Sequence, residues 1–163
     1  MKTLFIIRHS KSSWKDLSLL DFDRPLNTRG KRDAPFMGEK LKDRGIMPDI
    51  IISSPAKRAK CTIQSIVEVI GYEKEIIYNQ KIYESNMVTL KKIIKSIDDE
   101  NSCAFIVGHN PGLNMFVEDF CDFYDNIPTT GIVELEFNCD SWQDIDKFNC
   151  EMADFDYPKR YLV

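Results

Sequence analysis

The sequence lacks any apolar stretch that approaches the roughly 18–20 residues needed to cross a bilayer. The apolar run near the N-terminus is also far shorter than the core of a signal peptide, because it stops at Arg8. We therefore expect neither membrane insertion nor secretion, and we expect a cytoplasmic protein.

Features of several other protein classes are missing as well. Glycine and proline are scarce, with seven of each, which excludes collagen-like and low-complexity chains. The five cysteines are odd in number and widely spaced and form no CxxC, so we expect reduced thiols and no disulfide framework or zinc site. No P-loop, GxGxxG or HExxH motif occurs, and no cysteine is followed six residues later by arginine, which excludes cysteine phosphatases. We expect no bound metal and no cofactor.

The chain has no excess of positive charge. Its 22 Lys and Arg residues against 26 Asp and Glu residues give a net charge of −4, which disfavours nucleic acid and anionic membranes as partners. Any anion must therefore be bound by a local cluster of cations. The 163 residues, 43% hydrophobic and 29% charged, fit one globular domain over residues 1–163.

Strand-length apolar runs alternate with helix signals along the chain. Thr3–Ile7, Ile50–Ile52 and Cys103–Val107 are almost wholly apolar, as is typical of buried central strands. Ile132–Phe137 alternates, which predicts a strand with one wetter face, and Glu75–Tyr78 and Phe148–Phe155 are weaker strand candidates.

Capping residues predict four helices between these runs. The first is capped by Thr28 or Asp33 and runs to Arg44 before Gly45, with Pro35 either kinking it or marking its first turn. The second begins at Ser54-Pro55 and ends near Gly71. The third is capped by Asn86 and covers Val88–Ile97, and the fourth begins at Asn110-Pro111 and ends near Cys121. Strands that alternate with helices indicate an α/β sandwich around a mostly parallel sheet. Only 26 residues separate Arg58 from Glu84 and 25 separate Glu84 from His109, which leaves no room for a lid domain.

The only two histidines each follow a predicted buried strand, His9 after FIIR and His109 after FIVG. Ligands bind outside the carboxyl ends of the strands in open α/β sheets. The pattern therefore predicts one site built from both residues; the alternative is two unrelated loop histidines.

Positive groups surround this predicted site. Arg8 precedes His9, and Arg58 lies in the first turn of a predicted helix, where a cation opposes the helix dipole. Arg58 makes sense there if an anion binds to its guanidinium and to helix-end N–H groups. The alternative is a solvated surface arginine. A second helix start follows His109 directly, so the sequence outlines a phosphate pocket.

Several blocks carry a family resemblance. RHSKSSW (Arg8–Trp14) resembles the RHGx[ST]xW signature of the histidine phosphatase superfamily, also called phosphoglycerate-mutase-like; SSPAKRAKCT (Ser53–Thr62), VGHNPGL (Val107–Leu113) and TTGI (Thr129–Ile132) resemble its later blocks. DFDRPLNTRGKRDAPFMG (Asp21–Gly38) is similar to the SixA-like phosphohistidine phosphatases. The resemblance runs from the first strand to about Phe137 and implies a three-layer α/β/α sandwich without a lid domain.

The resemblance also implies roles for individual residues. His9 matches the nucleophile that forms a phosphohistidine intermediate, Arg8 and Arg58 match the phosphate-binding arginines, and His109 matches the second pocket histidine. Glu84 matches the acid that protonates the leaving group in many members; the alternative is a solvated carboxylate.

Two further residues complete the predicted phosphate pocket, and two positions depart from the family pattern. Ser10 and Arg24 are candidate phosphate-binding residues. Ser10 stands where the signature has Gly, so it must either take an ordinary φ or accept strain. Lys15 stands where mutase-type members have Asn, and both changes disfavour mutase chemistry.

Basic residues crowd the segment after His9, either as solvated charge or as a collar that attracts phosphorylated partners: Lys11, Lys15, Arg24, Arg29, Lys31 and Arg32. The leading function is a metal-independent phosphatase that hydrolyses phosphohistidine on proteins, or small phosphate esters, through His9. The alternatives are a phosphoglycerate-type mutase and a catalytically silent phospho-binding module. A module that only binds phosphate needs no nucleophile, so the presence of His9 argues against it.

Overall fold

The computed structural model describes residues 1–161, in which six strands form one mixed sheet of order β3-β2-β4-β1-β5-β6. The strands are β1 (Lys2–Arg8), β2 (Ile50–Ser53), β3 (Ile77–Tyr78), β4 (Cys103–Gly108), β5 (Ile132–Phe137) and β6 (Cys150–Asp156). The first four pair in parallel, whereas β5 and β6 are antiparallel to their neighbours. The predicted mostly parallel sheet is confirmed.

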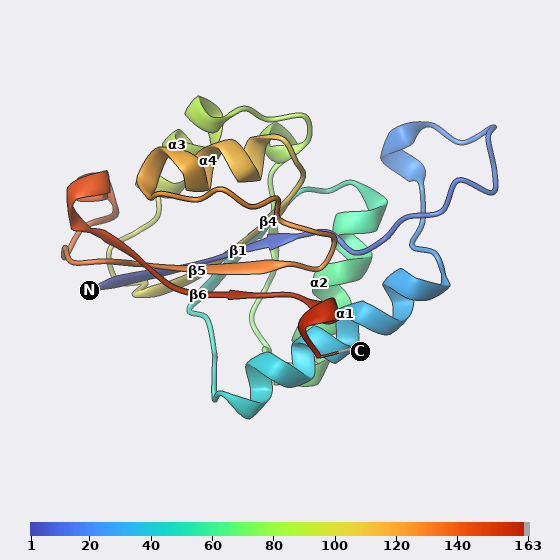
Figure 1. Cartoon of the computed structure of the whole chain (residues 1–163), viewed down its shortest axis with the longest axis horizontal. Helices are drawn as coiled ribbons and strands as arrows, with labels where there is room; N and C mark the ends of the chain where they lie inside the picture. Colours follow the sequence, from blue (N-terminus) through green and yellow to red (C-terminus); the bar gives the residue numbers. More distant parts are fainter. Residues whose placement is uncertain (162–163) are drawn as a thin grey trace.

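Four helices cover the two faces of this sheet. They are α1 (Thr28–Asp43), α2 (Lys57–Ile70), α3 (Met87–Lys95) and α4 (Gly112–Phe120). Figure 1 shows α1 and α2 on one face and α3 and α4 on the other, so the three-layer sandwich is confirmed, and no lid domain is evident in residues 1–161. Short 3-10 turns complete the described chain: η1 (Asp21–Asp23), η2 (Gln80–Ile82), η3 (Trp142–Asp144), η4 (Lys147–Asn149) and η5 (Pro158–Arg160).

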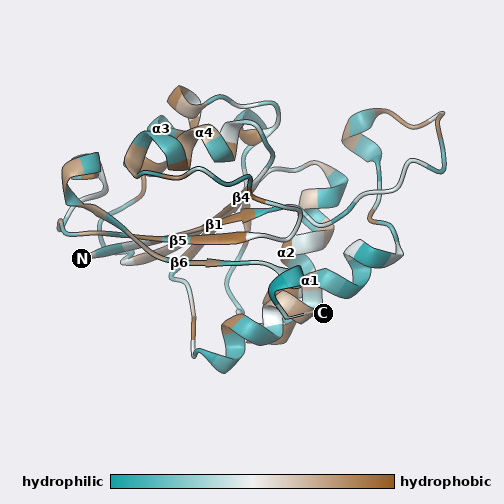
Figure 2. Cartoon of the chain, in the orientation of Figure 1, coloured by the Kyte–Doolittle hydropathy of each residue, from teal (hydrophilic) through white to brown (hydrophobic). Residues whose placement is uncertain are grey.

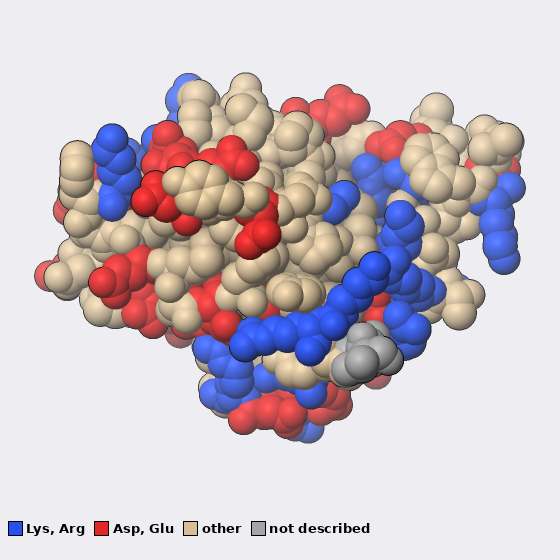
Figure 3. Space-filling view, viewed as in Figure 1, with Lys and Arg blue, Asp and Glu red and all other residues tan. Residues whose placement is uncertain are grey.

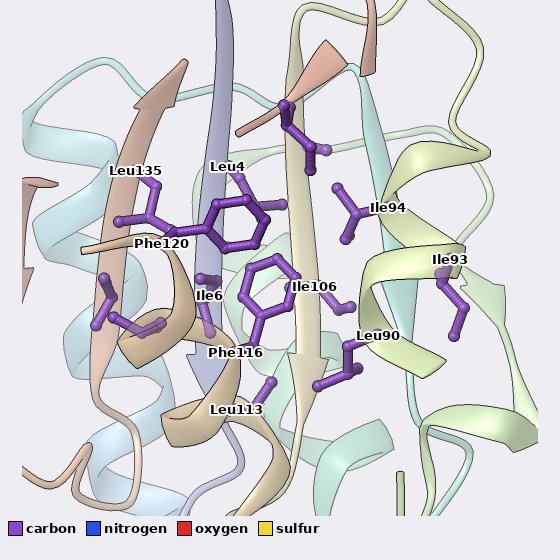
Figure 4. Packing of buried hydrophobic residues seen from close by; sticks show 14 of the residues in the cluster. Leu4, Ile6, Leu90, Ile93, Ile94, Ile106, Leu113, Phe116, Phe120 and Leu135 are labelled. Atoms are coloured by element: carbon purple, nitrogen blue, oxygen red, sulfur yellow. The ribbon is translucent and has the colours of Figure 1, made fainter. Parts of the chain in front are cut away.

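Each face of the sheet has its own hydrophobic cluster. On one face Leu4 and Ile106 of the central strands pack beneath Phe116 and Phe120 of α4 and Leu90 of α3 (Figure 4). The other face packs against α1 and α2. Burying one such side chain stabilises the fold by about 1.5–3 kcal/mol, so the two clusters fix the central strands and hence the ends of those strands. Hydrophobic residues accordingly lie along β1 and β5 in Figure 2.

The helix starts differ from the predictions by a few residues. Asn27, and neither Thr28 nor Asp33, caps α1, because its side chain accepts from the Gly30 N–H at 2.9 Å. Pro35 lies inside α1 and does not mark its first turn. These boundaries depend on which backbone groups remain free, and several capping residues in a row make that ambiguous in the sequence.

Later elements also shift slightly. Helix α2 begins at Lys57, two residues after the predicted start at Pro55. Helix α3 begins at Met87, directly after its predicted cap Asn86. The alternating pattern of β5 predicts one solvent-exposed face, but this face is only partly exposed. Glu134 on it is buried and accepts a hydrogen bond from Arg44 at 2.5 Å. Within residues 1–161, no helix combines the length and apolar character that crossing a membrane requires.

Candidate active site

The parallel pairing of β1 with β4 brings the two histidines together. Arg8 is in register with Gly108, so His9 and His109 leave the sheet side by side at the carboxyl ends of their strands. The centroids of their rings lie 5.1 Å apart. Strand β2 pairs with the other side of β4 and delivers Ser54 to the same edge. The structure thus places both histidines in one site.

The imidazole of His9 is held in one tautomer. Its Nδ1 lies 2.7 Å from the backbone oxygen of Ser10, and a carbonyl can only accept, so Nδ1 carries the proton and Nε2 keeps its lone pair. Burial, with a smaller contribution from the positive charges of Arg58 and Arg8, lowers the pKa of His9 to about 4. His9 is therefore a neutral imidazole with a free nucleophilic nitrogen at neutral pH.

His109 is also kept neutral. Burial, followed by smaller contributions from His9 and Arg58, lowers its pKa to about 3. Its Nε2 lies 2.7 Å from the hydroxyl oxygen of Ser54, whereas its Nδ1 is buried and has no hydrogen-bond partner. If the Ser54 hydroxyl donates to Nε2, Nδ1 is the N–H and can donate to an anion.

The two predicted arginines each keep one guanidinium nitrogen free. Arg8 donates through Nη1 to the backbone oxygen of Ile127 at 2.9 Å, and Arg58 donates through Nη1 to the backbone oxygen of Asp21 at 2.7 Å. The Nε atoms of both arginines are buried without a partner. Burial of Arg8 lowers the pKa of its guanidinium, as expected for a cation that lacks an anion.

Asp21 connects several residues of the site, although the sequence did not single it out as a site residue. Its carboxylate accepts from the Tyr83 hydroxyl at 2.6 Å, from Arg58 at 3.0 Å and from Arg24 at 3.1 Å. These bonds, with that of Tyr83 the largest, lower the pKa of Asp21 to about 2. Burial, together with this carboxylate, raises the pKa of Tyr83 to about 12, so the hydroxyl remains a donor.

Arg24 and Ser10, the two remaining candidates for phosphate binding, both contact other protein groups. Arg24 donates to Asp21 and Ser12, and its guanidinium carbon lies 3.6 Å from the ring centroid of Trp14. The Ser10 N–H donates to the Thr62 hydroxyl at 2.8 Å, and its own hydroxyl oxygen accepts from Thr130 at 2.7 Å.

These contacts give Ser10 a supporting place behind His9. Ser10 is completely buried and does not have a positive φ, so it fits the position of the family glycine without backbone strain. Its carbonyl accepts a hydrogen bond from the His9 Nδ1–H, and Thr62 and Thr130 fix the orientation of Ser10 itself.

Glu84 lies at the rim of the site. It has a positive φ of 57° and is exposed, and it lines a cavity of about 370 Å³ together with Arg58, Tyr83 and His109. The edge of the Tyr83 ring packs on His109, with the centroids 5.6 Å apart. Glu84 is therefore exposed at the rim of the cavity, whereas the partnerless nitrogens of Arg58 and His109 are buried.

The sequence missed three residues that orient the predicted ones: Asp21, Tyr83 and Ser54. Ser54 carried a signal, because it precedes a proline at a predicted helix start, but it contacts a histidine 55 residues away. Among residues 1–161, no group of three or more His, Cys, Asp or Glu side chains is arranged to bind a metal ion.

Comparison with known proteins gives related results from sequence and from structure. Residues 4–103 match the model of the histidine phosphatase superfamily, branch 1. An uncharacterised chloroplastic protein of Arabidopsis thaliana is 33% identical over 120 residues, which cover 68% of this chain and 55% of the plant protein. A 2,3-bisphosphoglycerate-dependent phosphoglycerate mutase of a Chelativorans species is 42% identical over 71 residues, which cover 42% of this chain and 34% of the mutase. The chain thus spans about half or less of the length of these two relatives.

A solved structure matches almost the whole chain. A candidate phosphohistidine phosphatase, SixA, from Agrobacterium tumefaciens is 27% identical, with a TM-score of 0.83 over 96% of this chain and 98% of that one.

Proposed function

The chain belongs to the histidine phosphatase superfamily, branch 1, and we propose that it is a phosphatase that hydrolyses phosphohistidine on proteins through a phosphorylated His9. One observation carries the proposal. The hydrogen bond at Nδ1 leaves Nε2 of His9 unprotonated, and the side chains of Arg8, Arg58 and His109 each hold one buried nitrogen without a partner. Unpaired buried donors are costly, and a phosphoryl group supplies acceptor oxygens for all three.

The reaction follows from this arrangement. Nε2 of His9 attacks phosphorus as the P–N bond to the substrate imidazole breaks, and the departing imidazole nitrogen takes up a proton from the solvent. The guanidiniums of Arg8 and Arg58 stabilise the charge on the equatorial oxygens. Water then attacks the phosphorus, the P–Nε2 bond breaks, and phosphate leaves with His9 restored. A covalent intermediate replaces one difficult displacement by two easier ones.

The open site favours a phosphate that is presented on a protein surface. A mutase must shield its phosphoenzyme from water, which an unlidded site does poorly. Small phosphate esters are the alternative substrate class. Mutase activity is a second candidate function, because a phosphoglycerate mutase is among the relatives.

Trapping of the phosphoenzyme tests the nucleophile. Rapid acid-free denaturation during turnover of a phosphohistidine protein should leave an alkali-stable, acid-labile phosphate on the wild-type chain. His9→Ala should carry none, and the matched variant His109→Ala should still carry some on His9. A phosphate that persists in His9→Ala would reject the assignment.

A substrate panel tests the function itself. We expect turnover of phosphohistidine proteins to exceed that of small phosphomonoesters and sugar phosphates. Turnover of 3-phosphoglycerate to its isomer, with no phosphate release, would establish the mutase instead.

A further inference from the structure

The segment that follows His9 forms a projecting arm, here residues 11–26. In Figure 1 it leaves the body of the molecule beside the carboxyl end of β1 and returns to the start of α1. Its ends are closed by an antiparallel bridge between Ser12 and Leu26 and by the Ser13 N–H donating to the Pro25 carbonyl at 2.8 Å. Compact surface loops whose ends meet in this way are frequently functional.

The base of the arm is fixed to α1. Asn27 donates its N–H to the Lys11 carbonyl at 3.0 Å, and Gly30 lies so close that an added Cβ would stand 2.2 Å from that oxygen. Only glycine permits this approach. The tip is ordered too, because the Asp16 carboxylate accepts from the Ser18 N–H at 3.0 Å. The arm is therefore a defined projection.

The arm exposes apolar side chains that the fold does not use. Trp14 is 64% exposed, Leu17 83% and Leu20 73%, with Leu19 beside them at 38%. Of the twelve exposed large hydrophobic residues in the described chain, these four fall within seven positions, whereas the others are scattered. Scattered exposed residues need no explanation, but a cluster marks an interaction site. Figure 2 shows this hydrophobic colouring on the outer part of the arm.

The arm is directly connected to the phosphate pocket. The Trp14 ring stacks on the guanidinium of Arg24, which donates to Asp21, and Asp21 in turn accepts from Arg58. A partner that covers the arm therefore also lies at the mouth of the pocket. Because the arm adjoins the pocket, the protein that carries the phosphate is the partner best placed to cover the arm.

Charge indicates the kind of surface that fits. The arm alone is neutral, but the arm and the first turns of α1 together, residues 11–33, hold six Lys or Arg residues against four Asp, a net charge of +2. Lys11, Lys15, Lys31 and Arg32 of this segment are exposed, and Figure 3 shows basic side chains along this part of the molecule. The remainder of the chain carries −6, the difference between −4 and +2, so an acidic partner is favoured on this side over the rest of the surface.

We propose that the arm is the docking surface for the protein substrate, an acidic protein whose phosphohistidine is flanked by apolar side chains. This rests on the proposed function. Docking through the arm raises kcat/KM for the phosphoprotein and leaves hydrolysis of a small phosphoramidate unchanged, because a small molecule reaches only the pocket.

The test compares two double variants on two substrates. Leu17→Asp with Leu20→Asp should lower kcat/KM for acidic proteins phosphorylated on histidine by about tenfold or more, with no change for phosphoramidate itself. The control is Tyr124→Asp with Phe148→Asp, whose side chains are 92% and 89% exposed outside the arm. It should leave both rates unchanged.

The outcomes separate this proposal from the function on which it rests. If the wild type hydrolyses no phosphohistidine, the proposed function fails. If it does so and the arm variant is as fast as the control on every phosphoprotein, the docking proposal is overturned. Cosedimentation of the wild type with anionic vesicles, lost in the arm variant while phosphoprotein turnover is unchanged, would assign the arm to a membrane and overturn it as well.

Discussion

The neutral state of His9 has a measurable effect on stability. In the unfolded chain an imidazole titrates near pH 6.5, whereas in the fold burial lowers the pKa of His9 to about 4. Because the folded-state pKa is the lower one, unfolding takes up a proton below pH 6.5. Stability that is present above pH 6.5 is therefore lost as the pH falls toward 4.

The size of this loss follows from the two values. At 1.36 kcal/mol per pKa unit, the gap between 6.5 and about 4 makes the loss about 3 kcal/mol between pH 7 and pH 4. The variant His9→Asn keeps an amide that can donate to the Ser10 carbonyl but cannot titrate. The chain has only one other histidine, and carboxylates such as Asp21 titrate in both proteins, so the difference between them isolates His9.

Urea unfolding followed by circular dichroism at several values between pH 7 and pH 4 provides the measurement. We expect the free energy of unfolding of the wild type to fall by about 3 kcal/mol more than that of His9→Asn over this range. Parallel curves for the two proteins would show that His9 is not held neutral by the fold, and would remove the physical basis for its nucleophilic role.

Three further predictions concern the pocket. Arg58→Ala should weaken vanadate inhibition by roughly 10–100-fold, which is the usual effect of losing a charged hydrogen bond. The control Lys57→Ala, at the exposed neighbouring position, should leave the inhibition constant unchanged. Equal inhibition constants for Arg58→Ala and the wild type would make Arg58 a structural residue. EDTA should leave activity unchanged, since the arginines supply the positive charge, and activity lost with EDTA and restored by Mg²⁺ would reject this pocket. Glu84→Gln should slow ester hydrolysis by roughly 10²–10⁴-fold and phosphohistidine hydrolysis far less, because only the alkoxide needs a positioned acid; equal losses would indicate a binding role.

Strand ends made most of the site predictable. Arg8-His9 and His109 follow apolar runs that can only be buried strands, and parallel pairing then places them side by side. The positions of these residues therefore depend on a strong local pattern and one topological rule.

The residues that orient them could not be found in this way. Asp21 binds Arg58 and Tyr83, which are 37 and 62 residues away in the chain, and Ser54 binds a histidine on another strand. Such contacts depend on how loops fold back over the sheet edge, and no periodicity encodes them. For the same reason the sequence does not reveal that Ser10 is bound by Thr62 and that Arg24 is bound by Asp21, so their place in phosphate binding stays a prediction.

The charges at the site explain why it can hold a phosphoryl group and also fold without one. Both histidines are neutral, and the three guanidiniums of Arg8, Arg24 and Arg58 act against the carboxylate of Asp21, which leaves two positive charges. A buried arginine with no counter-charge would be strongly destabilising. Asp21 relieves that cost by binding Arg58 through its Nη atoms, while the Nε atom remains free for the substrate. On the proposed function, the two charges that remain inside the pocket match a phosphoryl dianion, while the carboxylate of Glu84 lies outside them at the rim.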